Sequence, residues 1–141
     1  MAGAMYNSAF VAFMSGDIDL LNDTIIAMLL DSNYVPNVDN DDFIADISAD
    51  EISGGGYARD TLTTPAVTQD DSGDRGEFSS DDITGWSGDT FTGARYMVLA
   101  KSTGNDATSQ LIAYFDFLED KDAGFDVAVP SQGWFAIGAC P

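Results

Sequence analysis

The chain contains no histidine, one cysteine and only five basic residues among its 141 amino acids. Without histidine it lacks the commonest general base and the commonest metal ligand among protein side chains. Its single cysteine, Cys140, has no second cysteine for an internal disulfide, so only an intermolecular bridge is open to it. Five scattered cations cannot form the basic patch that nucleic acid phosphates require, so we expect no nucleic-acid partner.

A long hydrophobic run is also missing. A membrane-spanning helix needs about 20 consecutive apolar residues, and a signal peptide carries basic residues ahead of its apolar segment. Residues 1–16 meet neither condition, and the chain has no phosphate loop, dinucleotide fingerprint or GxSxG motif. Adjacent carboxylates do occur, but pairs arise by chance in so acidic a chain. We therefore expect no membrane partner and no enzymatic activity.

Acidic residues are as abundant as basic residues are few. Asp and Glu total 24, of which 21 are Asp, and the formal net charge is -19. Three interpretations are open: a solvated acidic surface, calcium binding by Asp-rich loops, and adaptation to very high salt. We favour the third, because at molar salt the Debye length is roughly 3 Å and the self-repulsion of such a surface is largely screened.

Two acidic loops gather the oxygen ligands that calcium prefers. The segment DNDDF offers Asp39 and Asp41, and the segment QDDSGDRGE offers Asp70 and Asp74. The second segment departs from the helix–loop–helix calcium pattern, because Arg75 stands where that pattern needs glycine and would place a positive charge beside the ion. We retain these four carboxylates as candidates for a bound cation and expect no other cofactor.

The densest apolar signal lies in residues 93–118, where the runs ARYMVLAK and LIAYFDFL are joined by a small polar segment. In the first run, Tyr96 and Val98 alternate with Met97 and Leu99. A strand that is apolar on both faces is covered on both sides, so the runs predict the two central strands of a buried sheet. In the second run the alternation assigns side chains to two faces: Leu111, Ala113, Phe115 and Phe117 to one, and Ile112, Tyr114 and Leu118 to the other.

Short apolar segments separated by Gly, Asp and Ser turns make up most of the remaining chain. We expect one helical turn and several further strands, the turn at 41–47 and the strands at 24–30, 57–62, 65–69, 77–79, near 83, at 125–129 and at 134–139. Many short strands with polar turns are typical of antiparallel sheets. The sequence therefore predicts one mostly β domain over residues 1–141, an antiparallel β-sandwich or barrel with one short N-terminal helix.

Both ends of the chain are uncharged, because every charged side chain lies between Asp17 and Asp126. Residues 1–16 have apolar side chains at helical spacing and predict a short amphipathic helix that ends at Gly16. Residues 127–141 predict a neutral last strand. Uncharged apolar ends in so acidic a chain either pack on their own domain or contact a partner. The side chains that we name as candidate partner contacts are Met5, Phe10, Phe13, Trp86 and Trp134.

Five successive segments carry a resemblance to a known family: YNSAFVAFMSGDIDL, DTIIAMLLDSNYVPN, EISGGGYARDTLT, AVTQDDSGDRGEFSSDDITGW and ARYMVLAKSTGNDATSQLIAYFDF. Over residues 6–117 the chain resembles a family of small virion proteins of tailed phages and related viruses. The resemblance implies a β-rich, capsid-associated or decoration-type protein. Its motifs belong to the scaffold, so it assigns no functional residue. Together with the Asp excess, it suggests a virus of a halophilic host, such as a haloarchaeal tailed virus.

Charge and resemblance together predict a decoration protein on the outer capsid surface of the virion. The expected partner is the major capsid protein, and the protein is expected as a homo-oligomer or in many copies per particle. Packaged genome would repel a domain of charge -19, so the acidic surface is expected to face solvent. Two alternatives stay open: a tail, neck or baseplate component of the same virion, and a calcium-dependent module that binds a host surface glycan.

Overall fold

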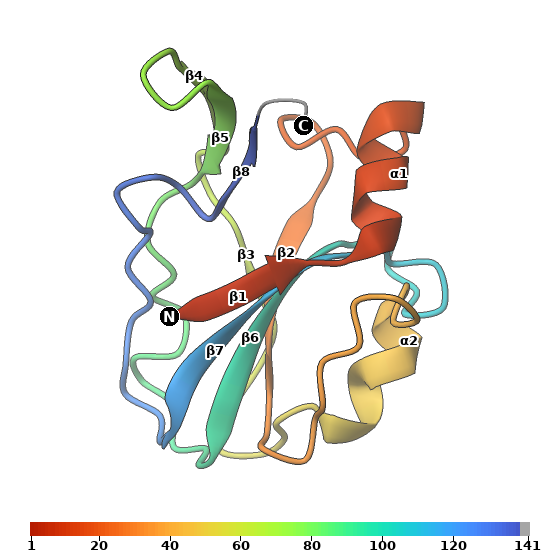
Figure 1. Ribbon diagram of the computed structural model, residues 1–141. Helices are drawn as coiled ribbons and strands as arrows, with labels where there is room; N and C mark the ends of the chain where they lie inside the picture. The colour runs from red at the N-terminus through yellow and green to blue at the C-terminus, as the bar shows by residue number, and fades with distance from the viewer. Residues whose placement is uncertain (139–141) are drawn as a thin grey trace.

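The computed structural model describes residues 1–138, and Ala139, Cys140 and Pro141 lie outside the described residues. The described chain folds into two antiparallel sheets with a few short helical segments (Figure 1). This arrangement confirms the predicted mostly β, sandwich-like fold. In chain order the elements are β1 (Ala2–Met5), α1 (Asn7–Ser15), β2 (Ile25–Leu30), α2 (Ile44–Ile47), the 3-10 helix η1 (Ser48–Asp50), β3 (Asp60–Thr61), β4 (Ala66–Asp70), β5 (Arg75–Ser79), β6 (Ala94–Lys101), β7 (Leu111–Lys121) and β8 (Phe135–Gly138).

The larger sheet has the strand order β1-β7-β6-β2-β3, so β6 and β7 lie inside it as the apolar runs predict. Both faces of β6 are covered. Met97 and Leu99 belong to the core on one face, and Val98 and Ala100 to the core on the other. The neighbouring strand β2 is buried at all six positions, because it too lies between layers that exclude water.

One β-bulge changes the predicted faces of β7. Leu99 pairs with Ala113 but Ala100 pairs with Leu111, so Ile112 is an extra residue on β7. An extra residue shifts the alternation by one position. Leu111 therefore lies in the same core as Ala100, and Ile112 joins the opposite core with Ala113. The assignment of Leu111 and Ile112 from strict alternation was wrong for this reason.

A second irregularity exposes Leu118. Tyr96 pairs with Asp116 whereas Ala94 pairs with Lys121, so β7 carries several extra residues here. Within this segment Leu118 adopts a positive φ of 67°, and its backbone N–H donates to the Asp116 carboxylate at 2.7 Å. The side chain is 63% exposed, so the prediction that it packs on the sheet was wrong.

The smaller sheet has the order β4-β5-β8 and covers one face of the larger sheet. Aromatic side chains fill the space between them. Phe78 of β5 packs on Phe135 of β8 with ring centroids 5.2 Å apart, and Trp134 meets Phe115 of β7 at 5.9 Å. This aromatic layer joins the two sheets, because burial of large apolar side chains is the main favourable contribution to folding.

The opposite face of the larger sheet is covered by α2 and the loop before it, and tyrosines mark this layer. The hydroxyls of Tyr6 and Tyr34 lie 2.7 Å apart, and Tyr34 donates to the Asp41 carboxylate at 3.0 Å. Burial raises the pKa of both tyrosines, so both hydroxyls stay protonated. Since Tyr34 uses its proton on Asp41, Tyr6 donates to Tyr34, and the chain of hydrogen bonds ties the end of β1 to this loop.

The N-terminal segment is not one helix. Residues 2–5 form an edge strand that pairs with β7, and α1 begins only at Asn7. Backbone pairing with β7 replaces the helical turn that the spacing of these side chains predicted. Gly3 permits this close pairing, because a Cβ atom at its position would meet the carbonyl of Tyr114. The predicted end of the helix is confirmed: Gly16 takes a left-handed conformation with φ 81°.

Several of the shorter predicted elements are smaller than expected. The helical turn begins at Ile44 and not at residue 41, and the Asp46 carboxylate accepts the backbone N–H groups of Asp42 and Phe43. The strands expected near residue 83 and at 125–129 reduce to one bridge between Ile83 and Val127. Only Asp60–Thr61 of the expected strand at 57–62 pairs, and Ala139 at the end of the last predicted strand lies outside the described residues.

Candidate docking face

The two uncharged ends of the chain lie side by side in the fold. In Figure 1, β1 (red) crosses the middle of the view, with β8 (blue) above it and α1 (red) at the upper right. Phe13 of α1 packs on Phe135 of β8 with ring centroids 6.0 Å apart. We call residues 1–15 and 129–138 together the neutral face, because none of them has a charged side chain. They form an uncharged region in a surface that is otherwise acidic.

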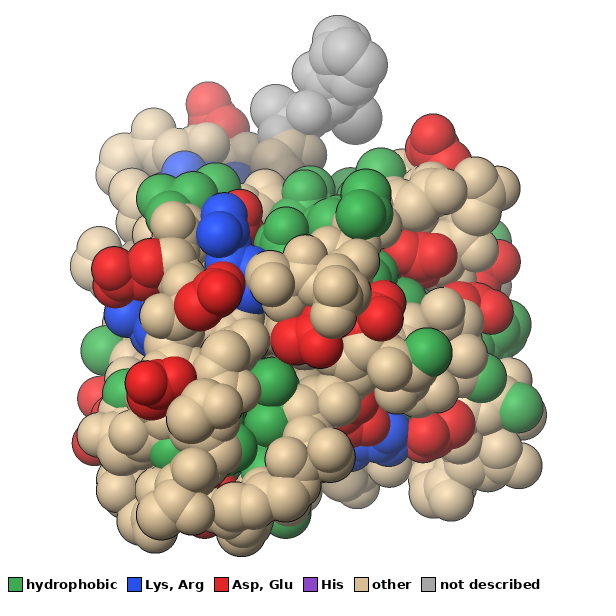
Figure 2. Space-filling view, turned by 90° about the horizontal axis from the view of Figure 1, so that it is seen from below, with side chains coloured by type: hydrophobic (Ala, Val, Ile, Leu, Met, Phe, Trp, Pro, Cys, Tyr) green, Lys and Arg blue, Asp and Glu red, His purple; other side chains and the backbone are tan. Residues whose placement is uncertain are grey.

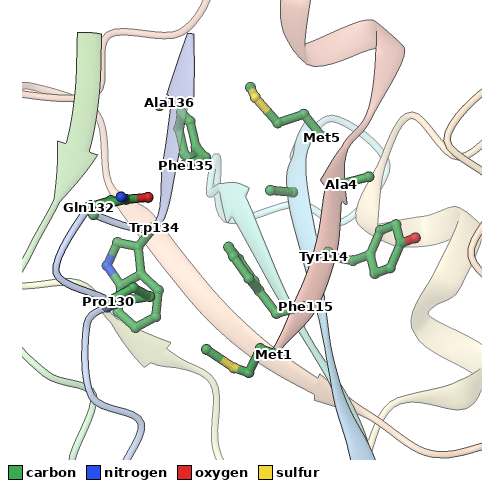
Figure 3. Close-up of a pocket in the computed structure, with 13 residues that line it drawn as sticks. Met1, Ala4, Met5, Tyr114, Phe115, Pro130, Gln132, Trp134, Phe135 and Ala136 are labelled. Atoms are coloured by element: carbon green, nitrogen blue, oxygen red, sulfur yellow. The ribbon is translucent and has the colours of Figure 1, made fainter. Parts of the chain in front are cut away.

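An apolar groove of about 430 Å³ runs along β1 within the neutral face. Figure 3 shows Met1, Met5 and Phe115 on one side of this groove and Trp134 and Phe135 on the other. Its floor is the edge of the larger sheet, and its opposite wall is β8 with the turn before it. No lining side chain is charged. The groove therefore offers a surface for apolar side chains and no charged side chain for ionic recognition.

The outward side of α1 extends the apolar surface beyond the groove. Val11 and Met14 are exposed, Met14 at 82%, and Phe10 is exposed at 39%. Ala9 and Ala12 lie on the inward side, where their small side chains let the helix approach the sheet closely. Three large apolar side chains on one short helix are more than the scattered exposed residues of an ordinary surface, and such patches mark interaction sites.

The five candidate contact residues from the sequence fall into different environments. Met5 lines the groove, Phe10 is exposed on α1, and Phe13 is half-buried. Trp86 is only 1% exposed and its indole N–H donates to the Ala58 carbonyl at 2.9 Å, so it is a core residue and its prediction as a contact is corrected. It was misplaced because a glycine-rich segment suggested an exposed loop.

Trp134 is also largely buried, at 4% exposure, and its indole N–H donates to the Ser80 hydroxyl at 2.8 Å. Only its edge borders the groove. Sequence reasoning missed Met1, Phe115 and Phe135 as groove residues. Phe115 lies in the middle of a predicted core strand, and only the pairing of β1 with β7 brings it to the groove. The lack of charge at both ends was the one available signal for the other two.

Outside the neutral face, all five basic side chains are paired with carboxylates. In Figure 2, acidic side chains are spread over the face in view, and the visible basic side chains lie beside acidic ones. The more exposed of these pairs, such as Lys121 with Glu119, contribute little to stability individually. All the pairs together leave most of the 24 acidic residues without a basic partner, so the net charge is carried by the solvent-exposed surface. The pairs are Arg59 with Glu51 and Asp106, Arg75 with Asp70 and Glu77, Arg95 with Asp116, Lys101 with Asp23, and Lys121 with Glu119.

One of these cations, Arg59, joins distant segments. Its guanidinium donates two hydrogen bonds to Glu51, at 2.8 and 2.6 Å, and two to Asp106, at 2.6 and 2.9 Å. Tyr57 donates to the same Glu51 carboxylate and accepts the backbone N–H of Leu29. Arg59 lowers the pKa of Asp106, and the carboxylates raise the pKa of Arg59. This cluster fastens η1 and the β6–β7 loop to β2.

The four carboxylates considered for calcium do not come together as a cation site. Asp39 and Asp41 accept hydrogen bonds from side chains and backbone of neighbouring segments. Asp70 accepts backbone N–H groups of its own turn, which lower its pKa, and it contacts Arg75 at 3.2 Å. Asp74 lies in the same turn, with a positive φ of 51°. Within residues 1–138 no group of three or more acidic, His or Cys side chains could hold a metal ion.

Comparison of the chain with protein-family models, with curated protein sequences and with solved structures found no match. Across the part of the chain that the structure describes, no helix has the length and apolar character to cross a membrane. The clearest functional feature of the molecule is its surface, which combines an uncharged, partly apolar face with a net charge of -19.

Proposed function

We propose that this protein is a structural component of a virus particle, a capsid decoration protein of a halophilic tailed virus that docks on the capsid through the neutral face. One observation supports this most strongly: two segments from opposite ends of the sequence, neither with a charged side chain, pack on each other and line an apolar groove. The resemblance over residues 6–117 supplies the viral context. The acidic remainder faces solvent, where many hydrated carboxylates keep a protein soluble at high salt.

The division of the surface into a neutral face and an acidic remainder fits a docking role better than a catalytic or calcium-dependent role. The groove has no carboxylate, histidine, cysteine, lysine or arginine side chain among its lining residues. The acidic loops that could recognise a glycan through calcium use their carboxylates in internal hydrogen bonds. Apolar contact is strengthened by salts that raise the effective cost of exposing apolar surface, whereas ionic docking is screened. A neutral face therefore suits attachment in concentrated salt.

Particle binding by two matched variants tests the proposal. Met14→Asp and Val35→Asp each place one carboxylate on an exposed apolar site, since Met14 is 82% and Val35 is 79% exposed. Met14 lies on the neutral face and Val35 on the loop over the other side of the large sheet. We expect Met14→Asp to weaken binding to particles by about tenfold or more, equivalent to about 1.4 kcal/mol, and Val35→Asp to leave it unchanged.

Copy number distinguishes the proposal from its alternative. Many copies on each purified particle, lost by treatments that strip the shell surface, agree with decoration, whereas a few copies retained on isolated tails indicate a tail, neck or baseplate component. Binding that survives a chelator but fails on transfer to low salt agrees with apolar docking. Equal loss of binding in both variants, or release of the protein by chelator, would contradict docking through the neutral face.

A further inference from the structure

The strand β1 is an open edge of the larger sheet. It is the last strand in the order β1-β7-β6-β2-β3, and three of its four residues are exposed. An edge strand presents unpaired backbone N–H and C=O groups, and natural proteins protect such edges with charged residues, proline, bulges or a covering segment. The sequence of β1, AGAM, has no charge and no proline, although the chain has 24 acidic residues elsewhere. The edge is left available for pairing.

The groove lies beside this edge and continues it. Met1 and Met5 stand along β1 on the groove side, and Trp134 and Phe135 face them from β8 (Figure 3). A strand added next to another lies about 4.8 Å away, and its side chains alternate between two faces. The added strand would thus send every second side chain into the groove, whose volume of about 430 Å³ is within the range of pockets that hold apolar groups.

We propose that the neutral face captures an extended segment of a partner protein, which adds to β1 as a further antiparallel or parallel strand. This proposal rests on the proposed function and specifies its mode of docking. The segment has apolar side chains at alternate positions, which enter the groove, and Lys or Arg at its ends. Strand addition gains affinity from backbone hydrogen bonds and specificity from the pockets for alternate side chains.

Charge favours a partner segment over a second copy of this chain. The lining of the groove is uncharged, but the surface around it belongs to a chain of net charge -19. Asp116 lies opposite Ala2 at one end of β1, and Asp39 accepts a hydrogen bond from Asn7 beyond the other end. Basic residues at the ends of a partner segment can pair with such carboxylates at contact distance, where salt screens least. The neutral face of a second copy has no basic side chain to offer. Pairing of two copies through β1 is therefore the competing outcome, and the experiment must distinguish it from binding of a partner segment.

A synthetic peptide of nine residues, Lys-Val-Thr-Val-Thr-Val-Thr-Val-Lys, serves as the probe for the full-length protein in molar salt. Two further versions carry N-methyl groups on alternate amides, one on each edge of the extended peptide. We expect the unmodified peptide to bind with perturbation of the β1 backbone amides in NMR spectra. Exactly one of the methylated versions should lose binding, because only one edge of the peptide donates hydrogen bonds to β1. Equal binding by all three would overturn strand addition.

Two variants with the same charge change locate the site. Met5→Lys places a cation in the groove, and Val35→Lys places one at a remote exposed position. Circular dichroism establishes that both remain folded. Met5→Lys should weaken peptide binding by about tenfold or more, about 1.4 kcal/mol. Val35→Lys should bind the peptide as the unchanged protein does. Equal weakening in both would show that only the flanking charges of the peptide are recognised and would overturn the proposal.

Sedimentation of the protein alone tests the competing occupant. A monomer in molar salt agrees with a partner segment, whereas a dimer that Met5→Lys dissociates would assign the edge to a second copy and overturn the proposal. The result is separable from the particle experiment. Particle binding that depends on Met14 without any peptide binding would leave decoration standing and refute strand addition. Peptide binding by a protein that does not associate with particles would leave strand addition standing and refute decoration.

Discussion

The centre of the larger sheet and its β1 edge are both uncharged, but for different reasons. At the centre, β2 is buried at every position, and burying an unpaired charge there would cost several kcal/mol, so charge is excluded by the fold itself. At the edge, Ala2 and Ala4 of β1 are exposed, and nothing in the fold excludes an Asp at either position. In a chain with 24 acidic residues, this exposed uncharged strand supports the docking role that we propose for the neutral face.

The largest effect is expected at the centre. Leu99→Ala removes a fully buried side chain between the two sheets, and we expect it to lower the free energy of unfolding by about 2–5 kcal/mol. Leu21→Ala makes the same chemical change at a site that is 53% exposed, where we expect a change within about 0.5 kcal/mol. Urea denaturation of both variants at fixed salt measures the contrast. Similar losses for the two would show that the centre is not the main source of stability.

The next largest effect concerns the cluster around Arg59. Arg59→Met leaves the carboxylates of Glu51 and Asp106 close together without their shared cation. Removing one partner of a buried pair costs about 3–5 kcal/mol, and because Asp106 is partly exposed to solvent we expect about 2–3 kcal/mol here. Arg59→Lys keeps the charge but not the planar fork of donors, so its loss should be smaller. Equal stability of Arg59→Met and the unchanged protein would contradict this role.

A third change acts on the edge. Gly3→Ala places a Cβ atom against the Tyr114 carbonyl and the Phe115 side chain, so β1 must move away from β7. We expect a loss of about 1–2 kcal/mol, the usual range for crowding a packed site. Amide hydrogen exchange should accelerate along β1 while the amides of β6 stay protected. Uniform acceleration in both strands would mean that the edge and the centre open together and are not separate regions.

The smallest effect concerns pH. Arg59 lowers the pKa of Asp106 in the fold, so the stabilisation from this pair is complete above the unfolded value of about 3.9 and is lost as the pH falls through the lower folded value. The stability difference between the unchanged protein and Arg59→Met should therefore shrink in acid, by no more than about 1 kcal/mol because Asp106 is partly exposed. Taking the difference removes the effect of the total charge, which changes equally in both proteins. If the stability difference between the two proteins grew in acid, the assigned direction of the Asp106 pKa shift would be wrong.

Much of the centre follows from local patterns in the sequence, and the edge does not. Runs that are apolar at both odd and even positions fit a buried helix or a covered strand. Their short length, aromatic and branched residues and flanking turns favoured strands, which is why β6 and β7 were predictable. The bulge at Ile112 depends on how β7 pairs with β6, and no property of its own neighbours shows it. The strand β1 depends likewise on a partner more than a hundred residues away, while its local spacing resembles a helix.

The sequence predicted which segments form the candidate site but not which of their side chains line the groove. The absence of charge at both ends identified the segments that form the neutral face. Which side chains line the groove depends on packing between those segments, so Phe115 and Phe135 were missed. Trp86 was wrongly assigned to the surface, because an aromatic residue among glycines can equally well turn inward when a backbone carbonyl accepts its indole N–H.

The position of Met1 has a practical consequence for anyone who handles this protein. Its side chain lines the groove, so the first residue lies within the surface that we assign to docking. An affinity tag fused ahead of it could fold back into the groove and block the very contact under study. The turn at residues 71–74 joins β4 and β5 at the far tip of the smaller sheet and is exposed, which makes it the better place to insert a tag or a fluorescent label.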